Sequence, residues 1–377
     1  MFKQILKGLA GGLARILPKF RYVYFKGMPS FEDSLVAIYL QLPEARFRKV
    51  VWSVYDKQDE PPFLVRGKTQ FVRKGSFRDF YYGMVSRYVF TTHGHFIDRI
   101  PSNQICVNTW HGMPFKKIGK LNGQHGRIDT LLCATSELFQ DIMSRSFGMP
   151  IEQTLITGIP RNDLLKSDNP RSIWDKAGIN RGCYNKVFFW LPTFRKSTFG
   201  YITEDGVEVD NVFGISDFPV DAFDSFLREH NCLCILKPHP MAPRKNAEST
   251  DHILVIDEDW LWSHGLTLYP LVGQTDFLVS DISSIMIDFI LLDRPMIVCF
   301  PDQKSYEESR GFVFEPIEDW LPAVVTNSYD DLIEEIAKCI SGVDLSGNKR
   351  RELAAKFHTH QNFNATQRLM NLVFKSE

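Results

Sequence analysis

Short runs of apolar residues alternate along the chain with segments whose apolar residues recur every three or four positions. In the first half, runs typical of buried strands lie at 22–27, 49–56, 87–93, 104–111 and 130–136, and residues 154–163 close this half. Between the first two runs, residues 30–42 have helical spacing and begin at a serine, a residue preferred just before a helix. This half therefore predicts strands joined by helices and turns.

The same alternation restarts after a polar, turn-rich stretch at 165–185. Strand-like runs follow at 186–195, 232–240, 253–259, 276–284 and 295–300, helical patterns at 221–230 and 284–293, and a mostly helical segment from 328 onward. Strands that alternate with helices are typical of parallel, doubly wound sheets, and 377 residues suffice for two domains. We predict the α/β class, with two Rossmann-like domains at 20–170 and 171–345 and a helical tail at 346–377.

The first 19 residues have a pattern of their own. Apolar residues recur at helical spacing, four basic residues lie among them, and no acidic residue is present. Such a helix can lie on an anionic membrane surface, and we expect residues 1–19 to do so. The alternative, a helix that packs on its own protein, stays open. No apolar run reaches the roughly 20 residues that a membrane-spanning helix needs.

Composition narrows the choice of partners. The formal net charge is -1, so no overall positive field indicates a nucleic-acid partner, and any anion site must be local. The seven cysteines show no paired CxxC spacing, which favours reduced, buried thiols and no zinc site. Neither a GxGxxG nor a GxxxxGK[ST] sequence occurs, which argues against dinucleotide and P-loop sites.

Polar side chains follow four of the predicted strands, where ligands of open α/β sheets bind. They are His111; Thr193 and Arg195; Lys237 and His239; and Asp281, Ser283 and Ser284. Arginine can grip a phosphate through two donors, histidine can donate to one, and serines at a helix start offer hydroxyl and backbone N–H groups. This conjunction predicts an anion site.

His111 has a different setting, between Trp110 and two nearby lysines, Lys116 and Lys117. A neutral histidine can act as a general base. Each residue also has a purely structural alternative: a hydrogen-bonded histidine, a helix cap, or lysines on a solvated face.

Five blocks in order resemble the CDP-glycerol glycerophosphotransferases of teichoic acid and capsule synthesis. They are WHGMPFKKIG, TGIPRND, LPTFR, LKPHP and SDISSIMIDFILLDRPMIVCFPD, and the resemblance covers roughly residues 20 to 370. It departs from the family at Ile282, where a tyrosine is usual, and in the C-terminal segment.

The resemblance implies a GT-B-like fold, two Rossmann-like domains that face a cleft, and transfer of a polyol phosphate to an acceptor hydroxyl with release of CMP. The N-terminal domain would take the acceptor and the C-terminal domain the CDP donor. His111 would be the general base, and Arg195 and His239 would assist catalysis. Thr193, Lys237, Asp281, Ser283 and Ser284 would join them around the diphosphate. Trp110, Gly112, Lys116 and Lys117 would line the acceptor side.

The family needs no metal or other cofactor. The implied partners are CDP-glycerol or CDP-ribitol and a lipid-linked (undecaprenyl-type) or polymeric acceptor. The enzyme would lie on the inner face of the cell membrane, and a homo-oligomer stays open. The alternative is a nucleotide-sugar glycosyltransferase or epimerase on the same frame.

Overall fold

Two all-parallel β-sheets organise the chain in the computed structural model. It describes residues 11–55, 67–97, 100–126, 129–193, 195, 206–207, 209, 211–239 and 248–374. Two compact units result: unit 1 comprises Met1–Met113, Gly119–Leu164 and Phe357–Glu377, and unit 2 comprises Pro114–Ile118 and Leu165–Lys356.

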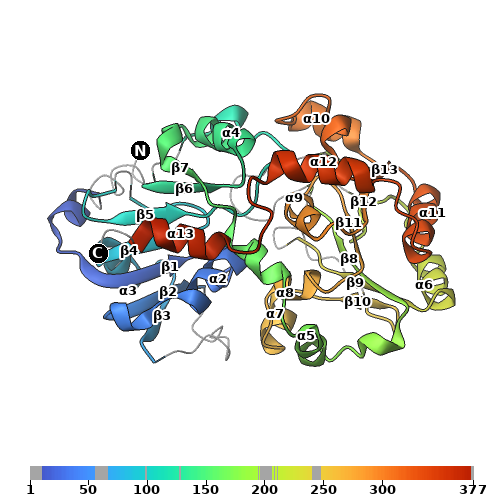
Figure 1. Cartoon of the computed structure of the whole chain (residues 1–377), viewed down its shortest axis with the longest axis horizontal. Helices are drawn as coiled ribbons and strands as arrows, with labels where there is room; N and C mark the ends of the chain where they lie inside the picture. The colour runs from blue at the N-terminus through green and yellow to red at the C-terminus, as the bar shows by residue number, and fades with distance from the viewer. Residues whose placement is uncertain are drawn as a thin grey trace. The chain divides into compact units, whose positions relative to one another are not determined.

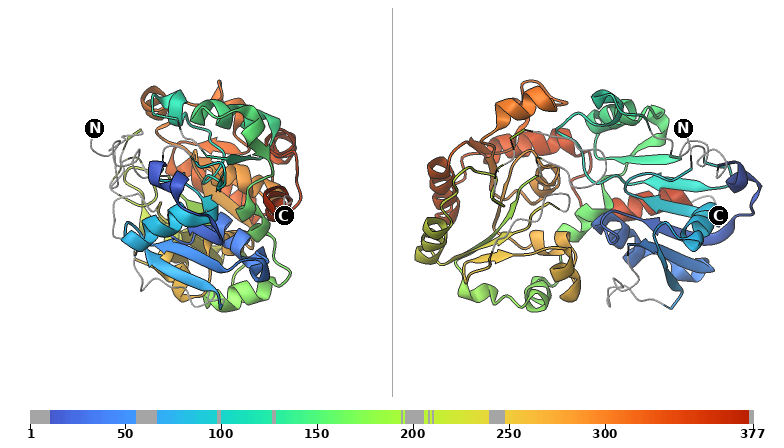
Figure 2. Two further views of the ribbon diagram at one scale, coloured as in Figure 1. Left: turned by 90° about the vertical axis from the view of Figure 1, so that its left-hand side faces the viewer. Right: turned by 180° about the vertical axis from the view of Figure 1, so that it is seen from behind.

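Unit 1 contains a seven-stranded sheet in the order β3-β2-β1-β4-β5-β6-β7 (Figure 1). Its strands are β1 Phe20–Lys26, β2 Lys49–Val54, β3 Thr69–Arg73, β4 Ser86–Thr91, β5 Ile105–Asn108, β6 Leu131–Ala134 and β7 Thr154–Ile156. Its helices are α2 Asp33–Gln41, α3 Phe77–Val85, α4 Glu137–Phe147 and α13 Ala365–Phe374. Helix α13 crosses one face of this sheet and lies behind the strands in the reverse view (Figure 2, right).

Unit 2 contains a six-stranded sheet in the order β10-β9-β8-β11-β12-β13. Its strands are β8 Lys186–Leu191, β9 Cys232–Leu236, β10 Ile253–Val255, β11 Phe277–Ser280, β12 Met296–Cys299 and β13 Val324–Thr326. Its helices are α5 Pro170–Ala177, α6 Val220–Glu229, α7 Glu258–Ser263, α8 Leu268–Val272, α9 Ile285–Phe289, α10 Gln303–Ser309, α11 Tyr329–Ile340 and α12 Gly347–Phe357.

Buried apolar side chains explain why these runs form central strands. Phe25 on β1 stacks on Trp52 of β2 and on Phe90 of β4, with ring centroids 4.7 and 5.5 Å apart. In unit 2, Trp190 of β8 is 1% exposed and packs against Phe213 and Phe223. Strands covered on both faces read as continuous apolar runs, which is the pattern seen in the sequence.

Each sheet has one point where the strand order reverses. In unit 1 it lies between β1 and β4, and in unit 2 between β8 and β11. The strands on either side of such a point send their connections to opposite faces, which leaves a crevice outside their carboxyl ends where ligands of this architecture bind. The predicted α/β class with two Rossmann-like parallel sheets is confirmed.

Two edge strands, β3 and β13, are not predicted from the sequence pattern, and the C-terminus is predicted as one tail. Strands β3 and β13 have only a few apolar residues each, so their pattern is weak. Helix α12 belongs to unit 2, whereas α13 packs in unit 1, where Phe374 contacts Phe47 and Tyr88. The predicted domain limits stay a prediction, but the tail is divided between the two units.

The predicted N-terminal helix falls partly outside the described residues, which begin at residue 11. Residues 11–16 are helical. Ala14 is buried against Met84 and Ile97, whereas Leu13 and Ile16 are 49% and 84% exposed. This turn thus packs on unit 1 through one face and presents apolar side chains on another. Within the described parts of the chain, no helix is long and apolar enough to cross a membrane.

Candidate active site

A strained turn after β5 presents His111. Trp110 has φ 57°, a value that non-glycine residues rarely adopt, and Gly112 follows with φ 123°. The turn is held by a chain of buried hydrogen bonds, in which Trp110 N donates to Asn108 Oδ1 at 2.9 Å and Asn108 Nδ2 donates to Asp129 Oδ2 at 2.9 Å. Strain that the surroundings maintain in this way is common where a side chain must be aimed at a ligand.

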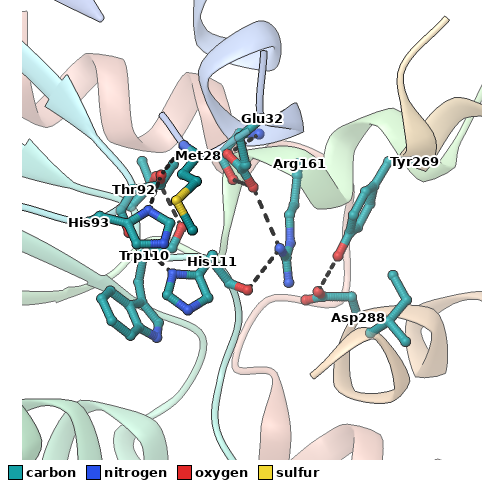
Figure 3. Close-up of polar contacts among 12 residues, drawn as sticks. Met28, Glu32, Thr92, His93, Trp110, His111, Arg161, Tyr269 and Asp288 are labelled. Carbon is teal, nitrogen blue, oxygen red and sulfur yellow. Dashed lines mark hydrogen bonds and ion pairs between the residues drawn. The ribbon is translucent and has the colours of Figure 1, made fainter. Parts of the chain in front are cut away.

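The imidazole of His111 is oriented by Thr92 at the end of β4 (Figure 3). Its Nδ1 lies 3.3 Å from the Thr92 carbonyl oxygen. Because a carbonyl can only accept, the hydrogen bond assigns the proton of a neutral ring to Nδ1 and leaves a lone pair on Nε2. The Trp110 ring covers the imidazole, with centroids 3.9 Å apart. This arrangement fits a general base, and it lies beside the point where the strand order of unit 1 reverses.

Arg161 holds the backbone of the same turn. Its Nη1 donates to the His111 carbonyl oxygen at 3.0 Å and lies 3.5 Å from Glu32 Oε1 (Figure 3). Both side chains are buried, and Glu32 also accepts from Ser34 N at the start of α2. The sequence analysis gave neither residue a role. The only signal was the PRND block, which contains Arg161.

Glu32 makes the support of this turn sensitive to pH. Burial raises the pKa of Glu32 to about 7, and the positive charge of Arg161, 3.5 Å away, opposes this shift only in part. A raised carboxyl pKa means that the fold disfavours the ionised form. The stability that the protonated Glu32 side chain contributes to the fold is therefore complete below about pH 4.5 and is lost as pH rises through about 7. The shift corresponds to on the order of 3 kcal/mol.

We expect Glu32→Gln to remove this dependence, because the amide cannot ionise but can still accept hydrogen bonds. The melting temperature of Glu32→Gln relative to wild type should rise between pH 5 and 8. Glu152→Gln, at an exposed position, is the control and should show no such trend. A constant difference between Glu32→Gln and wild type across this range would contradict the assignment.

In unit 2, the ends of β8 and β11 are joined by an ion-pair network at the reversal of strand order. Asp281 accepts from Thr193 N at 3.2 Å and Thr193 Oγ1 at 2.7 Å, and from Arg195 Nη1 at 2.8 Å. Arg195 also makes a two-pronged contact with Asp302, with Nε and Nη2 donating at 2.6 and 2.8 Å. Burial alone would lower the pKa of Arg195, but Asp281 and Asp302 raise it above its usual value.

The network changes how Arg195 is understood. Most of its donors are engaged by two carboxylates and Thr193 Oγ1, which lies 2.6 Å from Nη1. Its direct grip on a diphosphate stays a prediction, whereas its bracing of Thr193 and Asp281 is observed. Asp302 is not predicted as a partner from the sequence, although it is the last residue of the block SDISSIMIDFILLDRPMIVCFPD.

The remaining donor-side residues lie at strand ends as expected. Lys237 is buried and its Nζ contacts Glu258 Oε1 at 2.6 Å. His239 is half-buried three residues after β9. Ser283 and Ser284 precede α9, which has only five residues, and Ser284 makes no side-chain cap bond. Their contacts with a donor stay a prediction.

Lys116 and Lys117, which are predicted to lie on the acceptor side, belong to unit 2, whereas His111 belongs to unit 1. Residues 114–118 belong to unit 2. There the backbone of Lys116 forms an isolated antiparallel β-bridge with Phe312, and Lys117 Nζ lies 3.5 Å from Glu315 Oε1. Lys117 N also donates to the Gly311 carbonyl oxygen at 3.1 Å. Their local contacts could not be read from the sequence, because Glu315 is far along the chain. Their role toward an acceptor stays a prediction.

Cysteine thiols, histidines and acidic side chains are the groups of the chain that could bind a metal ion. All seven cysteines are free, and six are buried as expected, whereas Cys183 is exposed. In the described ranges, no group of three or more His, Cys, Asp or Glu side chains could hold a metal ion.

The family of the chain is shown by a family model. Residues 13–375 match the CDP-Glycerol:Poly(glycerophosphate) glycerophosphotransferase family. The chain belongs to this family, which confirms the resemblance seen in the sequence.

Individual relatives are more distant. The teichoic acid glycerol-phosphate transferase of Staphylococcus aureus (strain NCTC 8325 / PS 47) is 24% identical, over 95% of this chain and 94% of that protein. Two ribitol-phosphate polymerases of the same strain, TarK and TarL, are also 24% identical each. The chain spans only about half of their length, 53% and 49%.

Solved structures agree on the fold. The wall teichoic acid polymerase TagF matches with a TM-score of 0.74 at 20% identity, over 100% of this chain and 95% of that one. A UDP-GlcNAc 2-epimerase from Methanocaldococcus jannaschii matches with a TM-score of 0.53 at 11% identity. At these identities the likeness shows fold alone, and the predicted GT-B-like fold is confirmed.

Proposed function

We propose that this chain transfers glycerol phosphate, or a related polyol phosphate, from a CDP-activated donor to an acceptor hydroxyl and releases CMP. The acceptor would be a lipid-linked saccharide or growing polymer in teichoic acid or capsule-type synthesis. The observation that carries this proposal is the His111 imidazole, fixed by the Thr92 carbonyl oxygen as the tautomer that can accept a proton at Nε2. Membership of the family supports the donor and acceptor classes.

In the proposed reaction, His111 Nε2 takes the proton of the acceptor hydroxyl as its oxygen attacks the phosphorus that carries the glycerol. The bond from that phosphorus to the bridging oxygen breaks, and CMP leaves with the electron pair. Phosphoryl transfer depends mainly on positioning and on charge stabilisation. The residues of unit 2 at the ends of β8, β9 and β11 would position the donor diphosphate and stabilise its charge.

The test is CMP release by the purified chain from CDP-glycerol and from CDP-ribitol, with a lipid-disaccharide analogue as acceptor. We expect CMP from one of the two donors only when acceptor is present. CMP from neither donor with several acceptors would overturn the proposal. Turnover of UDP-sugars instead would favour the alternative of a nucleotide-sugar glycosyltransferase or epimerase on this fold.

We also propose that unit 1 binds the inner face of the cell membrane, where a lipid-linked acceptor is available. Helix α3 and the neighbouring helical turn at residues 11–16 expose large apolar side chains, and such exposed apolar patches are typical of surfaces that bind a membrane or a protein. In α3, Phe77 is 84% and Phe80 41% exposed, and on the turn at residues 11–16, Ile16 is 84% exposed. Ala14 and Met84 pack together between these helices. A homo-oligomer on this surface stays open.

The double variant Ile16→Ser/Phe77→Ser should bind anionic vesicles at least about 10-fold more weakly, because each buried apolar side chain contributes about 1.5–3 kcal/mol. Co-sedimentation with phosphatidylglycerol vesicles measures this. Leu345→Ser, at a 73% exposed position in unit 2, is the matched control. Equal binding by the double variant and the control would remove these helices from the proposed surface.

A further inference from the structure

A second histidine lies directly against the candidate base. His93 follows β4, and its ring is stacked on His111 with centroids 4.4 Å apart and an interplanar angle of 12° (Figure 3). The ring centroids of Trp110 and His93 are 5.9 Å apart, so the rings of His93, Trp110 and His111 form one cluster after β4 and β5. Both histidines are half-buried. The strand pairing that places Thr91 beside Asn108 brings them together.

The hydrogen bonds at Thr92 are compatible with different roles for the two rings. Thr92 Oγ1 accepts from Met28 N at 3.3 Å and lies 2.8 Å from His93 Nδ1. When the single hydroxyl proton of Thr92 is donated to His93 Nδ1, the neutral His93 ring carries its own proton on Nε2. His111 has the opposite tautomer, because its Nδ1 donates to the Thr92 carbonyl oxygen. In this arrangement Thr92 contacts both rings: Nε2 of His111 is left to accept, and Nε2–H of His93 is left to donate.

Stacking also constrains the charge of the pair. Two imidazolium rings at this separation would repel each other, so the pair readily accepts one proton but not two. If His111 takes the proton of the acceptor hydroxyl, His93 must act as a neutral donor. A neutral N–H suits a hydroxyl or phosphate oxygen, and such oxygens flank the reacting hydroxyl of a polyol or saccharide.

We propose that His93 is an acceptor-binding residue, whose Nε2–H donates to an oxygen of the polyol or saccharide next to the hydroxyl that His111 deprotonates. This inference rests on the proposed transferase function and assigns to it a residue that the sequence analysis did not single out. It also gives Thr92 a role, since one residue fixes the tautomers of base and anchor together.

Three variants separate the hydrogen bond from the ring stack. His93→Phe keeps an aromatic ring on His111 but removes the N–H, His93→Gln restores an N–H donor, and His93→Ala removes both. His125→Phe, at an exposed position of unit 1, is the matched control. Initial rates of CMP release are measured while the acceptor, a short-chain lipid-disaccharide analogue, and CDP-glycerol or CDP-ribitol are varied in turn.

We expect His93→Phe to raise the KM for the acceptor about 3- to 10-fold, which is the loss of one hydrogen bond, with the KM for the donor and the melting temperature nearly unchanged. His93→Gln should recover part of the loss. CMP release by wild type with an unchanged acceptor KM in His93→Phe overturns this inference alone. Equal rises of the donor and acceptor KM values also overturn it, because they indicate a structural ring. Absence of CMP release by wild type overturns the proposed function as well.

Discussion

His111→Ala should lower the turnover number by about 10²- to 10⁴-fold and leave the affinity for CDP-glycerol within about threefold of wild type. General-base catalysis contributes about this much, and the ring is held by Thr92 in the tautomer that a base requires. Donor binding should survive because the expected donor residues belong to unit 2, whereas His111 belongs to unit 1. Single-turnover CMP release and calorimetric titration with CDP-glycerol measure the two effects separately.

Two comparisons make this prediction specific. His125→Ala, an exposed histidine of the same unit, should have wild-type turnover. His111→Gln should be nearly as inactive as His111→Ala, because an amide can make a hydrogen bond but cannot accept the proton. A large loss of donor affinity in His111→Ala, or substantial activity in His111→Gln, would rule out the base.

The sequence was sufficient to place His111 just after a buried strand, because that signal is local. A continuous apolar run predicts a buried parallel strand, and polar residues just past its carboxyl end face the ligand edge of the sheet. The same reasoning placed Thr193 and Asp281 just after buried strands, as the structure shows for β8 and β11. It could not find that Thr193 donates to Asp281 at 2.7 Å, because that contact requires β8 and β11 to be neighbours.

The supporting residues were missed for the same reason. His93 and Thr92 follow β4, and they reach the His111 turn only because β4 pairs with β5. Arg161 lies 50 residues after His111 along the chain, and Glu32 lies 129 residues before Arg161. Local periodicity carries no information on strand order, so partners across the sheet need the fold itself. For β3 and β13, which have weak apolar patterns, even the strands themselves are not predicted from the sequence.

The variant Arg195→Ala tests whether this motif residue binds the donor directly or stabilises the residues around it. The Arg195 side chain is 11% exposed and forms ion pairs with Asp281, whose side chain is 6% exposed, and with Asp302, whose side chain is 11% exposed. Removing one partner of a buried ion pair leaves uncompensated charge and costs about 3–5 kcal/mol. Arg195→Ala should therefore lower the melting temperature of unit 2 by about 6–20 °C, in addition to weakening CDP-glycerol binding. Arg171→Ala, in an exposed pair with Asp175, is the control and should change the melting temperature little.

The double variant Arg195→Met/Asp302→Leu distinguishes the two roles of Arg195. Removing both charged side chains of the pair leaves only Asp281 to be accommodated, so much of the lost stability should return. Thr193 would then keep its bond to Asp281, and donor affinity should recover in part if Arg195 mainly braces these residues. If Arg195 contacts the diphosphate directly, the melting temperature recovers in the double variant and donor affinity does not. Unchanged stability in Arg195→Ala would contradict the bracing role and leave direct binding as the reason for its place in the motif.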